Sequence, residues 1–258
     1  MEGWVGLMLI DTHCHLYQIA DVEAAVRRAQ EQGVRRIVVV SEDAASMRKA
    51  LDLKGRFDGV MAGLGLHPAL VNRMPAEGVE AGLAFLRAHL READVLGEAG
   101  LDFKVVERPE DEAFQRSLLE QQFELAREAR RPVNLHSRRA LRETLEEAIR
   151  FRRETGLNAQ MHWFTQSKRL VRQACDQGIY VSVGPSVLDR PDTQEVVKGI
   201  ADDLLLLETD SPVPFGEAQS EPAWVRRVAE KVAEVKGVDC ERLAAQTAEN
   251  FERFLGQK

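Results

Sequence analysis

The sequence has few cysteines and no long apolar run. Its three cysteines, Cys14, Cys175 and Cys240, are odd in number and far apart, which excludes a disulfide framework and indicates a reducing compartment. No apolar run approaches the roughly 18 residues that a membrane-spanning helix needs. The first ten residues carry Glu2 and no basic segment, so we expect no secretory signal. These absences predict a soluble protein of the cytoplasm with no membrane partner.

An excess of basic charge is also lacking, because 35 Lys and Arg face 42 Asp and Glu and leave a net charge of −7. Tight passive binding of duplex DNA depends on basic side chains that neutralise phosphates, so this class of protein is disfavoured. An enzyme that meets nucleic acid through bound metal ions is not excluded. The 258 residues suffice for one large domain or two modest ones. No composition shift or linker divides them, so we predict a single domain over residues 1–258.

Short apolar runs alternate with longer segments of helical period along the whole chain. Each run is rich in branched residues and apolar on both faces, as buried parallel strands are. The predicted strands are Leu7–Asp11, Arg36–Ser41, Val60–Leu66, Val95–Leu101, Val133–His136, Ala159–Trp163, Ile179–Val183 and Leu204–Thr209. The predicted helices are Asp21–Gln32, Glu80–Glu92, Asp111–Arg130, Arg139–Glu154, Ser167–Asp176, Thr193–Asp202, Pro222–Lys236 and Asp239–Leu255.

This alternation predicts an α/β protein. Eight strands with intervening helices in about 250 residues have the size and rhythm of a (β/α)8 TIM barrel, here with C-terminal helices. A doubly wound open sheet shows the same alternation and is the structural alternative. The count of eight favours the barrel. We interpret the loop Ser211–Pro222 as part of the active face of that barrel rather than as a linker.

Histidines gather at the predicted strand ends. In a parallel barrel the carboxyl ends of all strands share one face, so groups scattered in the sequence converge there. Glu98 and Asp210 also close predicted strands, whereas His89 lies in the middle of a predicted helix and is interpreted as an exposed residue. Five of the six histidines occupy strand ends: His13, His15, His67, His136 and His162.

These residue types predict a metal site. His13 and His15 are two residues apart on one strand, so both imidazoles point the same way, and Cys14 between them points to the other face as a small buried residue. His136 or His162 alone would more often be a rim histidine, but Glu98 and Asp210 on the same face favour the ligand interpretation. Imidazoles with carboxylates suit Zn²⁺, Mn²⁺ or Fe²⁺, while Mg²⁺ prefers oxygen ligands.

The same residues carry a family resemblance. Its five blocks are Asp11-Thr12-His13-Cys14-His15-Leu16, Gly65-Leu66-His67-Pro68, Gly97-Glu98-Ala99-Gly100-Leu101-Asp102, Asn134-Leu135-His136-Ser137-Arg138 and Glu208-Thr209-Asp210-Ser211-Pro212. They occur in family order, and the resemblance extends from residue 11 to the C-terminal helix with Asn250-Phe251. Together they resemble the signature blocks of the TatD family of metal-dependent deoxyribonucleases, which are amidohydrolase-like barrels.

The resemblance implies two divalent metal ions (Mg²⁺, Mn²⁺ or Zn²⁺) and assigns their ligands. One ion would be held by His13, His15, Glu98 and Asp210, and the other by Glu98, His136 and His162. Glu98 would therefore bridge the two ions, which in such sites lie about 3.5–4 Å apart.

Further roles are predicted for three side chains at the site, and Glu98 and the first two of the three are predicted to be catalytic. Asp210 would also orient or deprotonate the attacking water. His67 would contact a substrate phosphate or assist proton transfer, with a structural hydrogen bond as the alternative. Glu208 would support a histidine or close the barrel, and a charge satisfied at the barrel mouth is an equal alternative.

The segments around the predicted site shape substrate space. After Asp102 the family often has an aromatic residue followed by polar or aromatic ones, where this chain has Phe103-Lys104-Val105-Val106-Glu107. After His162 the family often has a small residue or Cys, where this chain has Trp163-Phe164. We predict that Lys104 and Arg138 bind substrate phosphates, whereas Arg139 is better explained as surface charge. Trp163 is predicted to stack on a base, with packing as the alternative for it and for Phe164.

The resemblance implies a 3′–5′ exonuclease that cleaves phosphodiester bonds of single-stranded DNA or RNA with metal-activated water. A single-stranded nucleic acid is then the expected partner, and no protein partner is predicted. The alternative is a metal-dependent ester or amide hydrolase, such as an aminoacyl-tRNA deacylase, because the same water activation serves those bonds. A non-catalytic metal-binding scaffold is disfavoured, since every predicted ligand is present.

Overall fold

The structure, a computed structural model, describes residues 7–215 and 218–256. The chain divides into two compact units, and each is described by itself. We call residues 40–162 with 254–256 the central unit, and residues 7–39, 163–215 and 218–253 the terminal unit. The single domain over the whole chain stays a prediction.

Eight parallel strands follow one another in the sheet in chain order. A doubly wound open sheet would reverse its strand order at a switch point, so this order excludes that alternative and is the order of the predicted (β/α)8 barrel. The strands are β1 (Leu9–Cys14), β2 (Val34–Val40), β3 (Val60–Leu64), β4 (Val95–Asp102), β5 (Val133–Arg138), β6 (Ala159–Met161), β7 (Tyr180–Val183) and β8 (Leu205–Leu207).

Helices follow every strand. None in the described ranges is long and apolar enough to cross a membrane. The α-helices are α1 (Val22–Glu31), α2 (Ala44–Arg56), α3 (Pro68–Val71), α4 (Ala76–His89), α5 (Pro109–Ala129), α6 (Leu141–Thr155), α7 (Lys168–Asp176), α8 (Pro191–Val197), α9 (Val225–Lys236) and α10 (Cys240–Phe254). Short 3₁₀ turns are η1 (Leu16–Gln18), η2 (Pro185–Leu188) and η3 (Pro222–Trp224).

Several predicted boundaries were wrong. Helix α2 was not predicted, although Asp43 and Ser46 form a capping box at its start. His89 ends α4 instead of lying in its middle, and it pairs with Glu92 at 2.8 Å. The loop Ser211–Pro222 contains the antiparallel strands β9 (Pro214–Phe215) and β10 (Ala218–Gln219), while residues 216 and 217 lie outside the described residues.

Three strands also end later than predicted, and β4 does so by a single residue, Asp102. Strand β1 continues to Cys14, which pairs with Val39, so His13 lies within the strand. Strand β5 continues to Arg138, which pairs with Asp102, so His136 lies within it as well. The predicted strands ended where apolar residues give way to polar ones, but the backbone ladder does not depend on side-chain polarity.

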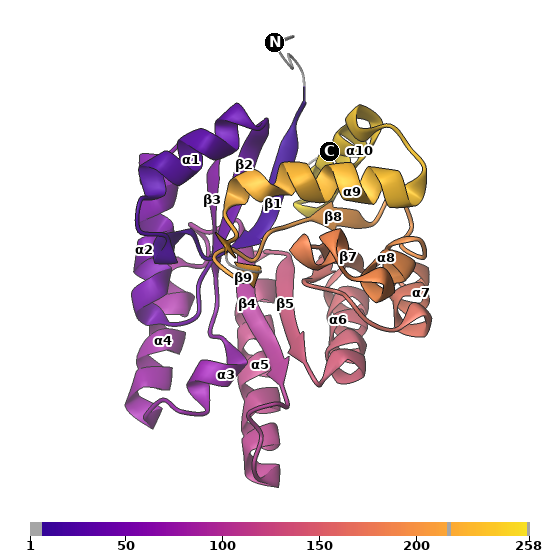
Figure 1. Cartoon of the computed structure of the whole chain (residues 1–258). Helices are drawn as coiled ribbons and strands as arrows, with labels where there is room; N and C mark the ends of the chain where they lie inside the picture. The colour runs from indigo at the N-terminus through magenta and orange to yellow at the C-terminus, as the bar shows by residue number, and fades with distance from the viewer. Residues whose placement is uncertain (1–6, 216–217, 257–258) are drawn as a thin grey trace. The chain divides into compact units, whose positions relative to one another are not determined.

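The central unit places β3, β4, β5 and β6 beside the helices that connect them. Helix α5 runs along β4 (Figure 1). Its inner face carries buried leucines and Phe123, whose ring centroid lies 4.7 Å from that of Phe151 in α6. The same inner face of α5 also buries two glutamines, Gln115 and Gln122, which is unusual for a helix packed against a sheet.

The terminal unit contains β1, β2, β7 and β8 with α1, α7, α8, α9 and most of α10. Helix α9 lies beside β1 and β8 (Figure 1) and buries Val225, Val228 and Val232 against them. An exposed ion pair, Arg28 with Glu221, joins α1 to the residue before η3 through two hydrogen bonds of 2.9 Å. Helix α9 thus packs on the two strands near whose carboxyl ends candidate site residues lie.

Candidate metal centre

In the central unit, three imidazoles converge on one carboxylate oxygen. Oε1 of Glu98 lies 2.6 Å from Nδ1 of His136, 3.0 Å from Nε2 of His162 and 3.4 Å from Nε2 of His67. The Glu98 side chain is only 3% exposed. We call these four residues the central cluster. A buried carboxylate among nitrogen donors is a suitable environment for a cation.

Strand β4 has the local structure that this convergence needs. Its pairing with β5 is irregular between Leu96 and Ala99, and Glu98 lies in this irregular segment. Gly100 has φ of +149°, and a Cβ there would come within 2.0 Å of the carbonyl oxygen of His136. Only glycine tolerates both conditions, so this position lets β4 approach the backbone of His136. The glycines around Glu98 thus serve the geometry of the site.

Asp102, which the sequence analysis did not assign to the site, supports His136. Its Oδ2 lies 3.3 Å from Nε2 of His136, on the opposite side of the ring from Glu98. When Nε2 donates its proton to Asp102, the lone pair of Nδ1 is directed to the side of Glu98, as in carboxylate–histidine–metal arrangements. Asp102 stands four residues after Glu98 on the same strand, and this even spacing was the signal that could have identified it.

The charges in this cluster shift two pKa values in opposite directions. Burial alone would lower the pKa of His136, but the carboxylates of Glu98 and Asp102 outweigh burial and raise it. Burial would raise the pKa of Asp102, but the hydrogen bond and charge of His136 lower it overall. A divalent cation is positively charged, as a protonated imidazole is, so the acidic partners of His136 favour either occupant.

His67 is the N-cap residue of helix α3 and makes a structural hydrogen bond, which was the alternative role predicted from the sequence. Its Nδ1 accepts the N–H of Ala69 at 3.0 Å, so the neutral ring carries its proton on Nε2. That Nε2 is the atom near Glu98. A protonated nitrogen donates a hydrogen bond and cannot bind a metal, so this geometry gives His67 a donor toward the central cluster.

In the terminal unit, two imidazoles share a second carboxylate. Oδ1 of Asp210 lies 3.5 Å from Nε2 of His13 and 3.4 Å from Nε2 of His15. The side chain of His13 is fully buried, whereas that of Asp210 is 20% exposed. Nδ1 of His15 lies 3.1 Å from the hydroxyl of Tyr17, which was not predicted as a site residue. We call His13, His15 and Asp210 the terminal cluster.

Backbone hydrogen bonds between the ends of β1 and β8 build the terminal cluster. The N–H of Asp210 donates to the carbonyl of His13 at 2.8 Å, and the N–H of His15 donates to the carbonyl of Ser211 at 2.6 Å. Asp210 has φ of +50°, in the left-handed region that aspartate tolerates better than most residues. These contacts place its carboxylate beside both histidines.

Asp11 stabilises the same junction between the ends of β1 and β8. Its carboxylate accepts the backbone N–H of Thr209 at 2.9 Å and the Thr209 hydroxyl at 2.5 Å. Burial raises the pKa of Asp11 well above its usual value, although these hydrogen bonds act in the other direction. Cys14 is fully buried as predicted, and burial raises the pKa of its thiol.

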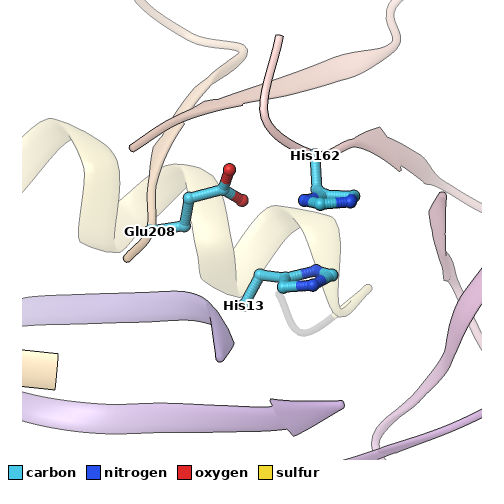
Figure 2. Close-up of side chains that lie close together, drawn as sticks. All are labelled: His13, His162 and Glu208. Atoms are coloured by element: carbon cyan, nitrogen blue, oxygen red, sulfur yellow. The ribbon is translucent and has the colours of Figure 1, made fainter. Parts of the chain in front are cut away.

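Glu208 has its hydrogen bonds satisfied within the terminal unit. Its carboxylate accepts the N–H of Trp163 at 2.6 Å and the hydroxyl of Ser182 at 2.5 Å. Figure 2 shows it with His13, and potential ligand atoms of the two lie within 4.8 Å of one another. His162, the third side chain in that view, belongs to the central unit. Glu208 thus combines a closing contact between β7 and β8 with a place near a predicted ligand.

The predicted substrate residues differ in exposure. Lys104 and Arg138 are exposed and follow or end strands β4 and β5, as is required for contact with a phosphate. Trp163 is half-buried and packs on Gly184, where a Cβ would come within 2.8 Å of its ring. Phe164 is 1% exposed, so it packs in the core.

The donor set fits a divalent cation. Potential ligand atoms of Glu98 and His136 lie within 4.8 Å of one another, and those of His13 and His15 do so in the terminal unit. Nitrogen donors combined with carboxylate oxygens suit Zn²⁺, Mn²⁺ or Fe²⁺.

Known proteins with these features identify the family. The family model described as TatD related DNase matches residues 10–256. The chain belongs to the TatD family. Among its relatives, the uncharacterized metal-dependent hydrolase YabD of Bacillus subtilis is 34% identical over 260 residues, which cover 96% of this chain and 99% of YabD. Human deoxyribonuclease TATDN3 is 30% identical over 262 residues, which cover 95% of this chain and 93% of TATDN3.

A solved TatD structure supports the fold. The crystal structure of YjjV, a TatD homologue from Escherichia coli, is similar with a TM-score of 0.85 and 25% identity, over 97% of this chain and 98% of YjjV. Membership of the TatD family makes this chain a metal-dependent hydrolase with a TIM-barrel fold, as the sequence predicted.

Proposed function

We propose that this TatD-family hydrolase cleaves phosphodiester bonds of single-stranded DNA and removes nucleotides from the 3′ end. The observation that carries the metal-dependent chemistry is the convergence of Nδ1 of His136 and Nε2 of His162 on Oε1 of Glu98, at 2.6 Å and 3.0 Å. The choice of DNA is supported by the relative TATDN3, which is named a deoxyribonuclease in human. Strand polarity and the preference for single strands rest on the resemblance found in the sequence.

Two divalent ions are proposed, one for each cluster. His13, His15 and Asp210 would hold one ion, and Glu98, His136 and His162 the other. The bridging role of Glu98 stays a prediction of the sequence. When bound, such ions lower the pKa of water and neutralise charge on phosphate oxygens. Each set provides two imidazoles and one carboxylate, which leaves coordination positions for water or substrate.

Asp210 is proposed as the base that takes a proton from the attacking water. Its carboxylate faces His13 and His15 yet keeps 20% exposure, so it can exchange a proton with solvent. His67 is proposed as a hydrogen-bond donor to a phosphate oxygen. Its Nε2 proton is available for this because Nδ1 already accepts the N–H of Ala69.

Substrate is proposed to bind through charge and stacking. Arg138 and Lys104 are exposed cations at the ends of β5 and β4, and each could neutralise one phosphate. Trp163 would stack on a base with the part of its ring that Gly184 does not cover. The three cysteines are free, which supports the proposal that the enzyme acts in the reducing cytoplasm.

The test is hydrolysis of 5′-labelled single-stranded DNA. The protein is stripped of metal, and Mg²⁺, Mn²⁺ or Zn²⁺ is restored separately, with Glu98→Ala as the inactive control. We expect a metal-dependent ladder that shortens by one nucleotide at a time and is absent in the variant. No ladder with any ion, together with hydrolysis of a simple carboxylic ester, would overturn the nuclease proposal and favour an esterase or deacylase.

A further inference from the structure

Two buried glutamines on helix α5 each bind one backbone residue of the central unit through two hydrogen bonds. Oε1 of Gln122 accepts the N–H of Leu66 at 2.8 Å, and its Nε2 donates to the carbonyl of the same residue at 3.2 Å. Gln115 does the same to Asp102, with distances of 2.7 Å and 3.0 Å. Both glutamines are 1% exposed. The carboxamide thus replaces the peptide group of a neighbouring strand.

The spacing of the glutamines explains how one helix supplies both. Gln115 and Gln122 are seven residues apart, which is nearly two helical turns, so they lie on the same face of α5. An amide among buried leucines is costly unless both of its polar atoms are bonded. Each carboxamide uses its oxygen and its nitrogen to bond the backbone of one residue. This face of α5 is therefore bonded to the chain at Leu66 and at Asp102.

Both target residues lie where the sheet no longer supplies partners. Leu66 comes after the end of β3 at Leu64, and the recorded pairing of β3 with β4 ends at Leu64 and Leu96. The N–H of Phe103 donates to Arg138 of β5, so the backbone groups of Asp102 point to the opposite side, where β3 has already ended. Buried backbone groups need partners, and the two glutamines provide them.

Leu66 and Asp102 both lie next to residues of the central cluster. Leu66 precedes His67, whose Nε2 lies near Glu98, and Asp102 contacts Nε2 of His136. We propose that Gln122 and Gln115 are positioning residues of the site, with Gln122 fixing the backbone that carries His67 and Gln115 fixing the carboxylate that orients His136. Helix α5 therefore positions two groups of the site, His67 after β3 and Asp102 at the end of β4. The expected effect of Gln115 and Gln122 on catalysis rests on the proposed function, but their effect on the positions of His67 and His136 does not.

The test uses the full chain with ¹⁵N-labelled histidines. Imidazole NMR signals are recorded at one pH, before and after Zn²⁺ is added, for Gln122→Met and Gln115→Met, which keep the side-chain length and lose the amide. We expect Gln122→Met to shift the signals of His67 more than those of His136, and Gln115→Met to do the reverse. If the methionine variants do not fold, Gln122→Glu and Gln115→Glu keep the acceptor for the backbone N–H and should give the same pattern with smaller shifts.

Two controls separate positioning from general destabilisation. Gln121→Met changes the exposed neighbour on the same helix and should shift neither histidine. Asn250→Leu removes a buried amide that bonds the carbonyls of Asp202 and Leu205 in the terminal unit, so it should lower the melting temperature without moving these signals. Equal shifts in the Asn250 variant, or no selective shift in the glutamine variants, would overturn the proposal.

Kinetics of the loaded enzyme give a second readout. We expect kcat to fall about 10-fold in Gln115→Met, as is usual when the support of a metal ligand is lost. KM should stay within about twofold in Gln115→Met and should rise in Gln122→Met, because His67 is the proposed donor to a substrate phosphate. If wild type cleaves no phosphodiester, the proposed function fails, and the NMR result still decides the roles of Gln115 and Gln122.

Discussion

The central and terminal clusters use the same residue types but differ in how they are held. In the central unit, Glu98 is 3% exposed and receives three imidazoles, and further side chains support them from behind. In the terminal unit, Asp210 is 20% exposed and is placed by backbone hydrogen bonds between strand ends. The first arrangement suits permanent binding of a cation, and the second suits exchange of protons with solvent. The central cluster thus depends on side chains for its positions, and the terminal cluster depends on the main chain.

This difference predicts where a single side chain matters most. In the central unit the positions of the groups depend on other side chains, such as Asp102 behind His136. In the terminal unit the main chain does most of the positioning, since Asp210 and His15 both donate their N–H groups across the β1–β8 junction. Substitutions that keep the backbone intact should therefore disturb the central cluster more than the terminal cluster.

The largest effect is expected for Glu98→Ala. Removal of the carboxylate leaves three imidazoles without their shared acceptor, and the loss of several kcal/mol of charge stabilisation corresponds to a fall in kcat of about 1,000-fold or more. Bound metal, measured by mass spectrometry of the desalted protein, should fall at the same time. Glu98→Gln, which preserves the side-chain volume, is the matched variant and should lose activity without a large change in melting temperature. Full activity in either variant would refute the assignment of the central cluster.

The next effect is expected for Asp210→Asn. The amide keeps the shape of the side chain but cannot take a proton, so kcat should fall about 100-fold, which is within the usual range for a lost general base. The imidazole NMR signals of His67 and His136 should remain at their wild-type positions, because the backbone of β8 is unchanged. Large shifts of those signals would show that the two clusters are not held independently.

The sequence predicted the fold class, because the strand count is a periodic feature, and it proposed site residues from their placement at strand ends. It could not predict the support of those residues. Asp102 was quoted in a family block but not assigned; its even spacing from Glu98 places it on the same side of β4, but its contact with His136 is seen only in the structure. Gln115 and Gln122 looked like ordinary polar positions of an amphipathic helix, and only their partners reveal their role.

Boundary errors have a related cause. His13 and His136 were predicted at strand ends because the apolar pattern stops there, but the backbone pairing continues past both residues. The ligand assignment did not depend on this, because alternation of side chains still places His13 and His15 on one side. Helix α2 was missed because its signal is the local capping box at Asp43 and Ser46, not a strong apolar periodicity.

The comparison extends to substrate contacts, where the central unit offers the exposed cation Arg138 and the terminal unit the ring of Trp163. Arg138→Gln should raise KM for single-stranded DNA and reduce the slope of log KM against log salt concentration by about 0.7, the value for one phosphate contact. The neighbouring Arg139→Gln is the control and should leave the slope unchanged. An equal change in both variants would indicate a general effect of surface charge.

The smallest effect is expected for Tyr17→Phe, which tests the terminal cluster directly. Its hydroxyl lies 3.1 Å from Nδ1 of His15, and this is the side-chain support that corresponds to Asp102 in the central unit. Because the backbone still holds His15, loss of one neutral hydrogen bond of about 1 kcal/mol should lower kcat only about fivefold. Tyr180→Phe, at the other tyrosine of the chain, is the control. A loss larger than that of Gln115→Met would mean that side chains, and not the β1–β8 backbone bonds, position the terminal cluster, and the contrast between the two clusters would then be wrong.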